Sequence, residues 1–418
     1  MSVTILRANA LALPLADSSV DLVVTSPPYF GLRSYQDGGE HYQGQIGSEA
    51  TPTEFVDALI AATREMVRVL KPSGSIFVNL GDKYVADNRG SGADAKRGEA
   101  KHAPRGPLGF VTGGMRQKSL MGIPWRYAIR CIDELGLILR AEVIWSKPNG
   151  LPESVTDRVR RSHEQWFHFT LNPRYYSAVD EIREAHAPRT IEQHKIDMRA
   201  GVGESVSQYR SAEGHGRRGR SHTPEPNPLG KLPGSVWTIP TEPLRVPESL
   251  GIDHFAAFPT EWPRRIITGW SPREVCTACG EGRRPVVEKE YTPTQGVTTR
   301  RRGFQDLYDA DREGAMRAGT GLVVGNTLAT ITGYACACPD TTAPTTPGVV
   351  LDPFGGTGTT ALVADVLGRH GITVDLSADY CRLAEWRTTD PGQRAKAARV
   401  EPVDAPSPDQ PDLFEDPA

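Results

Sequence analysis

Short apolar runs and amphipathic segments alternate along the first part of the chain. Val3–Leu6 and Val20–Val24 are apolar runs bounded by turn-forming residues, which is typical of buried parallel strands. From Thr53 to Leu70 the apolar residues recur at helical spacing, and the turn at 71–74 ends this pattern before an apolar strand at Ser75–Leu80. The pattern predicts a strand, a helix and a second strand in succession.

The alternation continues along the rest of the chain. Ile123–Leu135 is a second amphipathic segment that stops at Gly136, and a strand is predicted at Leu137–Trp145. The later elements are predicted at Trp262–Trp270 (helix), Gly348–Leu351 (strand), Ala361–Leu367 (helix) and Gly371–Leu376 (strand). Strands that alternate with helices indicate an α/β fold with a doubly wound sheet.

Long segments without a sustained period separate these elements. With 42 Gly and 34 Pro among 418 residues, long irregular connections are expected. Residues 87–118 are predicted to form a mobile loop, and residues 169–234 form a loop-rich segment that regains order near Ser235–Ile239. Residues 276–338 read as a polar insertion, and the proline- and acid-rich residues 401–418 are predicted to be disordered.

The net charge of −3 is unevenly distributed. Glu401–Ala418 carries six acids and no Lys or Arg, so the remaining residues sum to +3. A mild basic bias in the loops at 87–118 and 181–231 fits a polyanionic partner, and a solvated loop explains it equally well. No signal peptide or membrane span is readable, which predicts a cytoplasmic protein without a membrane partner.

A glycine-rich turn joins a buried strand to a helix near the C-terminus. The stretch reads Asp352-Pro-Phe354-Gly355-Gly356-Thr-Gly358-Thr359-Thr360. Glycines let a ligand approach the backbone closely, and a helix N-terminus with threonine hydroxyls suits a carboxylate or a phosphate. About 20 residues later, Asp375 ends the next strand, where an acid can accept hydrogen bonds from ribose hydroxyls. The alternative for the glycine-rich stretch is a tight turn without a ligand, and the alternative for Asp375 is a helix N-cap.

A second loop follows the strand at Val20–Val24. It reads Ser26-Pro27-Pro28-Tyr29 and lies at the sheet edge where α/β folds bind ligands. The two prolines remove two N–H donors, which leaves carbonyl groups and the Ser26 hydroxyl as acceptors beside an aromatic face. That combination suits a planar group that bears an NH2, and a simple proline turn is the alternative.

The two loops together resemble the catalytic and cofactor loops of S-adenosylmethionine-dependent DNA amino-methyltransferases, which modify cytosine N4 or adenine N6. The order of the loops resembles the circularly permuted beta class, in which a target-recognition segment falls between them. The resemblance covers roughly Val3–Phe169 and Ser235–Arg387. It implies a Rossmann-like methyltransferase sheet with a catalytic half at 1–168, a recognition segment at 169–234, and a cofactor-binding half at 235–275 and 339–400.

The resemblance also implies roles for individual residues. The catalytic residues are expected to be Ser26, Pro27, Pro28 and Tyr29, with Tyr29 stacking on a flipped base whose amino hydrogens are held by Ser26 and the Pro27 carbonyl. The residues expected to bind S-adenosylmethionine are Asn9, Phe258, Pro259, Asp352, Phe354, Gly355, Gly356, Gly358, Thr359, Thr360 and Asp375. The stretch His254-Phe-Ala-Ala-Phe258-Pro259 resembles the motif before the cofactor loop, and Leu70–Asn79 and Val143–Asn149 resemble later strands of the catalytic half. In the family the first strand usually ends in Gly-Asp, whereas this chain has Ala8-Asn9-Ala10 at that place. The alternative for Asn9 is a turn residue without a cofactor role.

In the family that these loops resemble, Ser-Pro-Pro-Tyr leans towards cytosine N4 and Asp-Pro-Pro-Tyr towards adenine N6, so the resemblance implies cytosine N4, with adenine N6 as the alternative. The implied partners are double-stranded DNA and, in a restriction-modification system, a cognate restriction endonuclease, which places the protein on the nucleoid of a bacterium or in a phage-infected cell. The alternatives are a protein glutamine-N methyltransferase and a catalytically silent DNA-binding protein. Related folds that methylate glutamine use Asn-Pro-Pro-Tyr, so Ser26 counts against the first alternative. The intact catalytic and cofactor loops count against the second.

Two further clusters carry candidate chemistry. Cys276-Thr-Ala-Cys279-Gly and Cys336-Ala-Cys338 predict a structural Zn²⁺ held by four thiolates in a small zinc-binding insertion at 276–338, with loose surface thiols as the alternative. Cys131 and Cys381 are expected to be core residues. The run Arg158–Glu164 fits contact with DNA phosphates and fits a solvated charge run equally well, and the aromatic residues after it fit strand core.

Overall fold

The computed structural model describes residues 2–31, 36–37, 40–41, 45–85, 110–111, 114–150, 152–192, 205–206, 220–221, 226–252, 258–299, 322–340 and 342–399. The chain divides into two compact units. The first comprises Met1–Ala178, Gly234–Arg284 and Cys336–Ala418, and the second comprises Val179–Pro233 and Pro285–Ala335. The second unit therefore combines parts of both segments that the sequence sets apart from the sheet. Most of the predicted loop at 87–118 and the whole tail at 401–418 lie outside the described residues.

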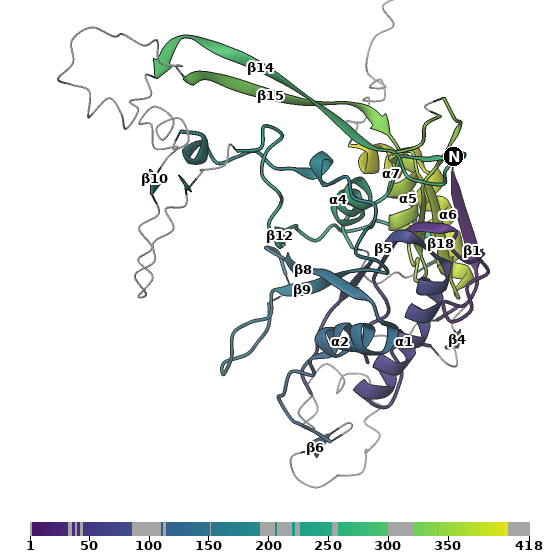
Figure 1. Cartoon of the computed structure of the whole chain (residues 1–418). Coiled ribbons are helices and arrows are strands. Elements are labelled where there is room, and N and C mark those ends of the chain that lie inside the picture. The colour runs from purple at the N-terminus through teal and green to yellow at the C-terminus, as the bar shows by residue number, and fades with distance from the viewer. Residues whose placement is uncertain are drawn as a thin grey trace, which may run out of the picture. The chain divides into compact units, whose positions relative to one another are not determined.

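An eight-stranded sheet forms the centre of the first unit (Figure 1). In spatial order its strands are β1 (Val3–Arg7), β18 (His370–Asp375), β17 (Val349–Asp352), β2 (Val20–Thr25), β5 (Leu70–Leu80), β9 (His163–Thr170), β8 (Ile138–Ser146) and β12 (Val236–Thr238). The first five strands are parallel, β9 runs antiparallel to both of its neighbours, and β12 runs parallel to β8. Strands from the two ends of the chain thus lie side by side.

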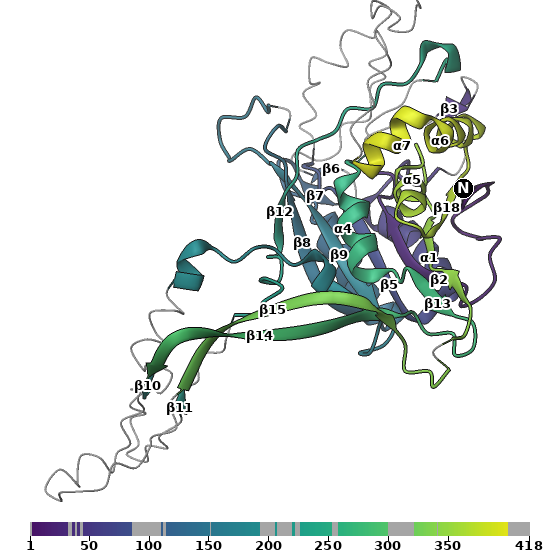
Figure 2. The same ribbon diagram turned by 90° about the horizontal axis from the view of Figure 1, so that it is seen from above.

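Helices cover both faces of this sheet. Helices α1 (Pro52–Val69) and α2 (Ile123–Leu135) pack on one face, and α4 (Glu261–Trp270), α5 (Thr359–Val366) and α7 (Pro391–Ala398) pack on the other, which Figure 2 views from above. Alternate strand residues enter opposite cores: in β5, Ile76 and Val78 join the core under α1, and Phe77 joins the core under α4. Because both faces are covered, the strands read as continuous apolar runs.

Local signals explain where the helices begin and end. Thr51 and Glu54 form a reciprocal capping box at the start of α1, and Pro52 occupies its first turn. Helix α2 ends at Gly136, whose left-handed conformation suits a glycine C-cap. Helix α6 (Ala378–Thr389) begins at Ser377, whose hydroxyl accepts from the Tyr380 N–H. The predicted helices at 53–70 and 123–135 are confirmed within one or two residues.

Two elements differ from the prediction. Residues 71–74 were predicted as a turn between helix and strand, but β5 already begins at Leu70 and includes them. Lys71, within this stretch, forms an ion pair with the buried Asp21 at 2.8 Å. The aromatic stretch 166–169 lies in β9, a central strand between β5 and β8, and Trp166, Phe167 and Phe169 are fully buried. The alternative of strand core for these aromatic residues is therefore correct.

Two-stranded sheets complete the described structure. The two-stranded sheets are β3 (Gln36–Asp37) with β4 (Glu40–His41), β6 (Phe110–Val111) with β7 (Met115–Arg116), β10 (Ser205–Val206) with β11 (Arg220–Ser221), β13 (Glu274–Cys276) with β16 (Thr345–Pro347), and β14 (Arg284–Thr299) with β15 (Leu322–Ala335). Two 3-10 helices lie at η2 (Val179–Ile182) and η4 (Glu248–Leu250). Within the described ranges, no helix has the length and apolar character needed to cross a membrane.

Candidate functional site

The loops singled out from the sequence follow the carboxyl ends of neighbouring parallel strands. Ser26 follows β2, Pro353 follows β17, Asp375 ends β18 and Ala8 follows β1. Parallel strands bring their carboxyl ends to one edge of a sheet, which is where open α/β folds bind ligands. A cavity of about 730 Å³ opens at this edge.

Most of the predicted site residues line this cavity. Those in its wall are Asn9, Ser26, Pro27, Pro28, Tyr29, Phe258, Phe354, Gly355, Gly356, Thr359 and Asp375. Four predicted cofactor residues lie outside the wall, namely Asp352, Gly358, Thr360 and Pro259. Of the motif at 254–259, residues 254–257 lie outside the described residues. The first and last parts of the chain, represented by Tyr29 and Gly356, thus meet in one cavity.

Asp352 lies beneath the glycine-rich loop and joins it to the other loop. Its carboxylate accepts hydrogen bonds from the Thr25 hydroxyl at 2.7 Å, the Thr360 hydroxyl at 2.8 Å and the Phe354 N–H at 3.1 Å. Complete burial raises the pKa of Asp352 to about 6, although these hydrogen bonds act in the opposite direction. Asp352 therefore fixes the two loops against each other and does not face the cavity.

Asp375 organises the opposite side of the glycine-rich loop. One carboxylate oxygen accepts from the Gly356 N–H at 2.9 Å, and the other accepts from the Ser377 N–H at 2.9 Å. Gly355 lies so close to β18 that an added Cβ would stand 1.6 Å from the Thr373 hydroxyl oxygen. The loop is thereby held against the end of β18 with an acid at the cavity wall.

Asn79 holds the Ser26 hydroxyl in one orientation. The Asn79 amide donates to the Gln165 carbonyl at 3.1 Å, which turns its oxygen toward Ser26 and Tyr29. The Ser26 hydroxyl donates to this oxygen at 3.2 Å, and the Tyr29 hydroxyl lies 2.7 Å from it. Because the hydrogen of Ser26 is committed to Asn79, the lone pairs of Ser26 are left to accept hydrogen bonds.

Tyr29 is fixed at both ends of its side chain. Its hydroxyl lies 2.7 Å from a carboxylate oxygen of Glu164, and Glu164 forms an ion pair with Lys147. Its ring lies against the backbone of Gly81, where an added Cβ would come within 2.6 Å of the ring. Lys147 lies 4.0 Å from the centre of the Trp145 ring. The tyrosine ring is therefore held at a defined place in the cavity wall.

Two other predicted cofactor residues lie in this wall. Asn9 makes a turn in which its side-chain oxygen accepts from the Leu11 N–H at 2.9 Å, and the same residue lines the cavity. Phe258 packs edge-on against Trp166, with ring centres 5.8 Å apart. The rings of Phe258 and Phe354 give the cavity apolar surface near the glycine-rich loop.

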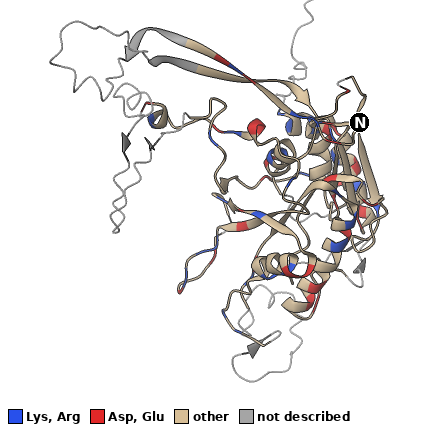
Figure 3. Cartoon of the chain, in the orientation of Figure 1, with Lys and Arg blue, Asp and Glu red and all other residues tan. Residues whose placement is uncertain are grey.

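The arginine run after β8 is divided between the cavity and internal contacts. Arg161, His163 and Glu164 line the cavity, and Arg161 lies 3.5 Å from a carboxylate oxygen of Asp82. Arg158 lies over the Tyr84 ring at 3.7 Å and pairs with a glutamate. Figure 3 shows basic residues along much of the connection between β8 and β9. Part of this run is thus already neutralised within the protein.

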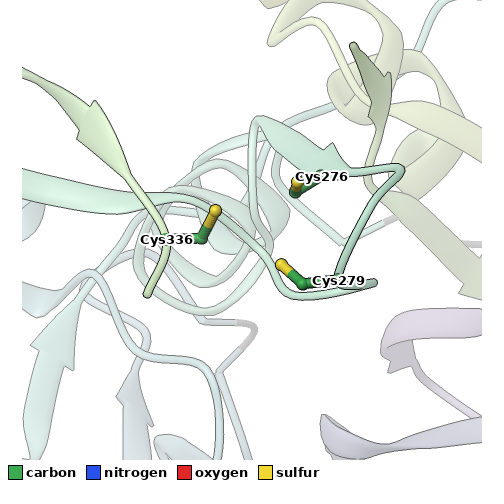
Figure 4. A group of neighbouring side chains, drawn as sticks. All are labelled: Cys276, Cys279 and Cys336. Atoms are coloured by element: carbon green, nitrogen blue, oxygen red, sulfur yellow. The ribbon is translucent and has the colours of Figure 1, made fainter. Parts of the chain in front are cut away.

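Three of the four predicted metal ligands converge. The sulfur atoms of Cys276, Cys279 and Cys336 lie within 4.8 Å of one another (Figure 4). Backbone N–H groups of Cys279 and Ala278 lie against the Cys276 thiol and lower its pKa to about 7. Cys338 is not part of this three-thiol group in the described structure. All three converging thiols belong to the first unit, although residues 285–335 between them belong to the second.

Sequence reasoning gave no catalytic or cofactor-binding role to three polar residues of the cavity wall, Asn79, Lys147 and Glu164. Asn79 and Lys147 occur in the stretches that resemble later strands, and each lies at or just after the carboxyl end of a strand, β5 for Asn79 and β8 for Lys147. A polar side chain at that end of an apolar strand is the signal that could have identified them. Glu164 is at the start of the antiparallel strand β9, so no such rule applied to it.

Known proteins resemble this chain in sequence and in fold. The profile of the DNA methylase family matches residues 20–275 and 342–386. The Type II methyltransferase M.XycI of Xanthomonas campestris pv. cyanopsidis is 35% identical over 266 residues, which cover 63% of this chain and 71% of that protein. The Type II methyltransferase M.SmaI of Serratia marcescens is 28% identical over 375 residues, or 89% of this chain and 85% of that protein.

A solved structure shares the fold. PvuII DNA methyltransferase (cytosine-N4-specific) superposes with a TM-score of 0.50 over 96% of this chain and 91% of that chain, at 16% sequence identity. This likeness concerns the fold alone, whereas the family profile covers more than half of the sequence. The chain therefore belongs to the DNA methylase family of N6 and N4 amino-methyltransferases.

Proposed function

We propose that this protein transfers a methyl group from S-adenosylmethionine to the N4 amino group of a cytosine that is flipped out of double-stranded DNA. One observation carries the proposal: the loop with Ser26 and Tyr29 and the loop with Gly355 and Gly356 line the same cavity. Its volume of about 730 Å³ lies within the usual range for ligand sites.

The residues around the glycine-rich loop fit the cofactor. Phe258 and Phe354 offer apolar ring faces for the adenine, and the Asp375 carboxylate in the same cavity wall is the acceptor we assign to the ribose hydroxyls. Asn9 is the acceptor we assign to the adenine amino group. S-adenosylmethionine supplies an activated methyl group on a sulfonium, and the protein supplies binding and orientation.

The residues around Ser26 fit the target base. A base in a duplex has to leave the stack to react, at a cost of about a few kcal/mol. We assign the flipped base to the face of Tyr29, with its amino hydrogens held by the Ser26 hydroxyl and the Pro27 carbonyl. Acceptors on both hydrogens favour a more tetrahedral, nucleophilic nitrogen. Holding the nitrogen in line with the methyl group supplies most of the rate.

The donors in the cavity wall support cytosine over adenine. On its Watson–Crick edge cytosine carries two acceptors besides its amino group, N3 and O2, whereas adenine carries one on that edge, N1. Lys147 and Arg161 place cationic donors in the same wall as Ser26. The fold neighbour from the PvuII system is named cytosine-N4-specific, which supports the same choice.

The reaction can be tested directly with labelled cofactor. We expect DNA incubated with the protein and methyl-labelled S-adenosylmethionine to yield N4-methyldeoxycytidine after digestion to nucleosides. N6-methyldeoxyadenosine instead would overturn the choice of base and keep the reaction. Label on protein glutamine, or no transfer at all, would overturn the proposal.

The Type II names of the relatives suggest a partner. We infer that a cognate restriction endonuclease cuts the site that this enzyme methylates, and that the recognition segment at 169–234 selects that site. Plasmid DNA methylated in a host that expresses the protein is expected to resist this endonuclease.

Asp375→Asn is expected to weaken the affinity for S-adenosylhomocysteine by about tenfold, because a hydrogen bond to a charged group contributes about 1.5–3 kcal/mol. Asparagine keeps the size of the side chain and one acceptor oxygen. Titration calorimetry measures the change, and Asp379→Asn, four residues later in the first turn of α6 and outside the cavity wall, is the matched control. Unchanged affinity in Asp375→Asn would count against the ribose assignment.

We also propose that the three converging thiols hold a structural Zn²⁺. With Zn–S bonds of about 2.3 Å, the sulfur atoms of a tetrahedral site lie about 3.8 Å apart, which fits thiols within 4.8 Å of one another. The Cys276–Cys279 turn is closed by hydrogen bonds from Cys276 N to Glu281 O and from Gly280 N to Cys276 O, 2.9 and 2.8 Å long. Cys338, two residues after Cys336, is the nearest further thiol in sequence for the fourth position.

Removal of this metal is expected to lower Tm by about 5 °C, since metal binding contributes folding free energy. Mass spectrometry of the purified protein should give one zinc per chain, which is lost in Cys276→Ser and Cys336→Ser and retained in Cys381→Ser. Metal loss in Cys338→Ser would identify it as the fourth ligand. Wild-type protein without zinc, and with an unchanged Tm after chelation, would overturn this proposal and leave the three thiols without a metal.

A further inference from the structure

A buried arginine lies behind the glycine-rich loop. Arg387 belongs to α6, which lies beside α5 in Figures 1 and 2, and only 3% of its surface is exposed. Its Nη1 donates to the Thr357 hydroxyl at 2.5 Å and to the Thr359 hydroxyl at 2.6 Å. Both threonines line the cavity, whereas Arg387 does not.

The charge of Arg387 is incompletely compensated. Among the described residues no carboxylate lies within ion-pair distance of it, and its Nε has no hydrogen-bond partner. Burial lowers the pKa of Arg387 to about 10, and the field of Glu242 offsets part of this effect. The group stays protonated at neutral pH. A buried cation without a paired acid is costly, so a compensating anion is expected nearby.

The arginine also determines which way the threonine hydroxyls point. A guanidinium has donors and no acceptor, so the oxygens of Thr357 and Thr359 accept from Arg387. Their own hydrogens must then point elsewhere. The two oxygens are 3.2 Å apart, so one hydroxyl can donate to the other, which leaves at least one hydrogen for the cavity. Helix α5 begins at Thr359 and adds its unpaired N–H groups at the same place.

We infer that Arg387 is a positioning residue that, through Thr357 and Thr359, prepares the loop to bind the carboxylate of the cofactor's methionine portion. The inference rests on the proposed function, because it assumes this cofactor. A carboxylate here gives the buried charge its partner. The same charge repels the cationic sulfonium, which favours a cofactor orientation with its carboxylate at the threonines and its methyl group toward Ser26.

A test compares two ligands that differ in the carboxylate alone, S-adenosylhomocysteine and its decarboxylated form, by titration calorimetry. Arg387→Met is expected to weaken binding of the first by about 10- to 100-fold and of the second by less than about threefold. Arg387→Lys, which keeps the charge, should restore part of the difference. Equal weakening for both ligands in a folded variant would assign Arg387 a purely structural role and overturn the inference.

Further arms keep the test decisive. If Arg387→Met does not fold, Thr359→Val and Thr359→Ser replace it. The valine variant should bind S-adenosylhomocysteine no better than its decarboxylated form, whereas the serine variant should still prefer S-adenosylhomocysteine. A valine variant that keeps the full preference for S-adenosylhomocysteine would overturn the inference. A wild-type protein that binds both ligands equally would also overturn it while the proposed function stands, whereas a protein that binds neither would defeat the proposed function first. Inorganic phosphate is the remaining arm, and its binding to wild type without any preference for the carboxylate would show a phosphate site instead.

Discussion

Tyr29→Ala is expected to lower kcat by about 500- to 10,000-fold, because stacking of a base on an aromatic ring contributes about 1–3 kcal/mol and a misplaced reactant costs about a further 100-fold. The ring is held by the hydroxyl contacts with Asn79 and Glu164 and by the backbone of Gly81. Alanine removes the surface against which the flipped base would be oriented. Single-turnover methylation with labelled cofactor measures the effect.

The cofactor side of the cavity should be unaffected by this change. We expect the affinity of Tyr29→Ala for S-adenosylhomocysteine to stay within about twofold of wild type, since Tyr29 acts on the base. Tyr29→Phe is the matched control: it keeps the ring, loses the hydroxyl, and should lower kcat by about tenfold or less. Wild-type turnover in Tyr29→Ala would remove the stacking role.

The second large effect is expected at Gly355. Gly355→Ala should lower the free energy of unfolding by about 3 kcal/mol and abolish measurable cofactor binding, because its Cβ would stand 1.6 Å from Thr373 Oγ1. Thr373 is β-branched and 2% exposed, so its side chain has little freedom to move away. Chemical denaturation and titration calorimetry measure the two effects.

Two comparisons separate this collision from a general glycine effect. Gly234→Ala is the control, since its added Cβ would meet nothing within 4 Å and its backbone φ is ordinary for any residue. The double variant Gly355→Ala, Thr373→Ala removes the colliding oxygen and should recover more than half of the lost stability. Equal stability for Gly355→Ala and wild type would show that β18 can shift away from the added Cβ, and would contradict this prediction.

The helices and strands of the sheet were largely predictable because their signals are local. Helix α1 carries its cap at Thr51 and Glu54, and α2 ends at Gly136. The antiparallel strand β9 was not predicted as an element; strand core was only one of the interpretations of its aromatic residues. Its place beside β5 pairs residues 85 to 95 positions apart, such as Leu80 with Gln165 and Ser75 with Thr170, so no short-range pattern predicts this pairing.

The cavity was predictable in its loops and unpredictable in its contacts. Parallel strands bring Ser26 and Gly356 to one edge by rule, so their meeting follows from the topology. The contact between Tyr29 and Glu164 joins residues 135 positions apart, and it needs the exact place of β9 in the sheet. Similarly, Asp352 has the residue type of a ligand contact, but its burial under the loop turns it into a link between Thr25 and Thr360.

The pairing of β1 with β18 has a consequence for synthesis on the ribosome. β1 is at the edge of the sheet and pairs with β18, which ends at Asp375. β1 therefore cannot pair until β18, more than 360 residues later in the sequence, has been synthesised. Contacts of such long range slow folding and leave an unfinished sheet exposed in the meantime. A nascent chain that stops before β17 has no wall for the cofactor, so prematurely terminated products should leave DNA unmodified.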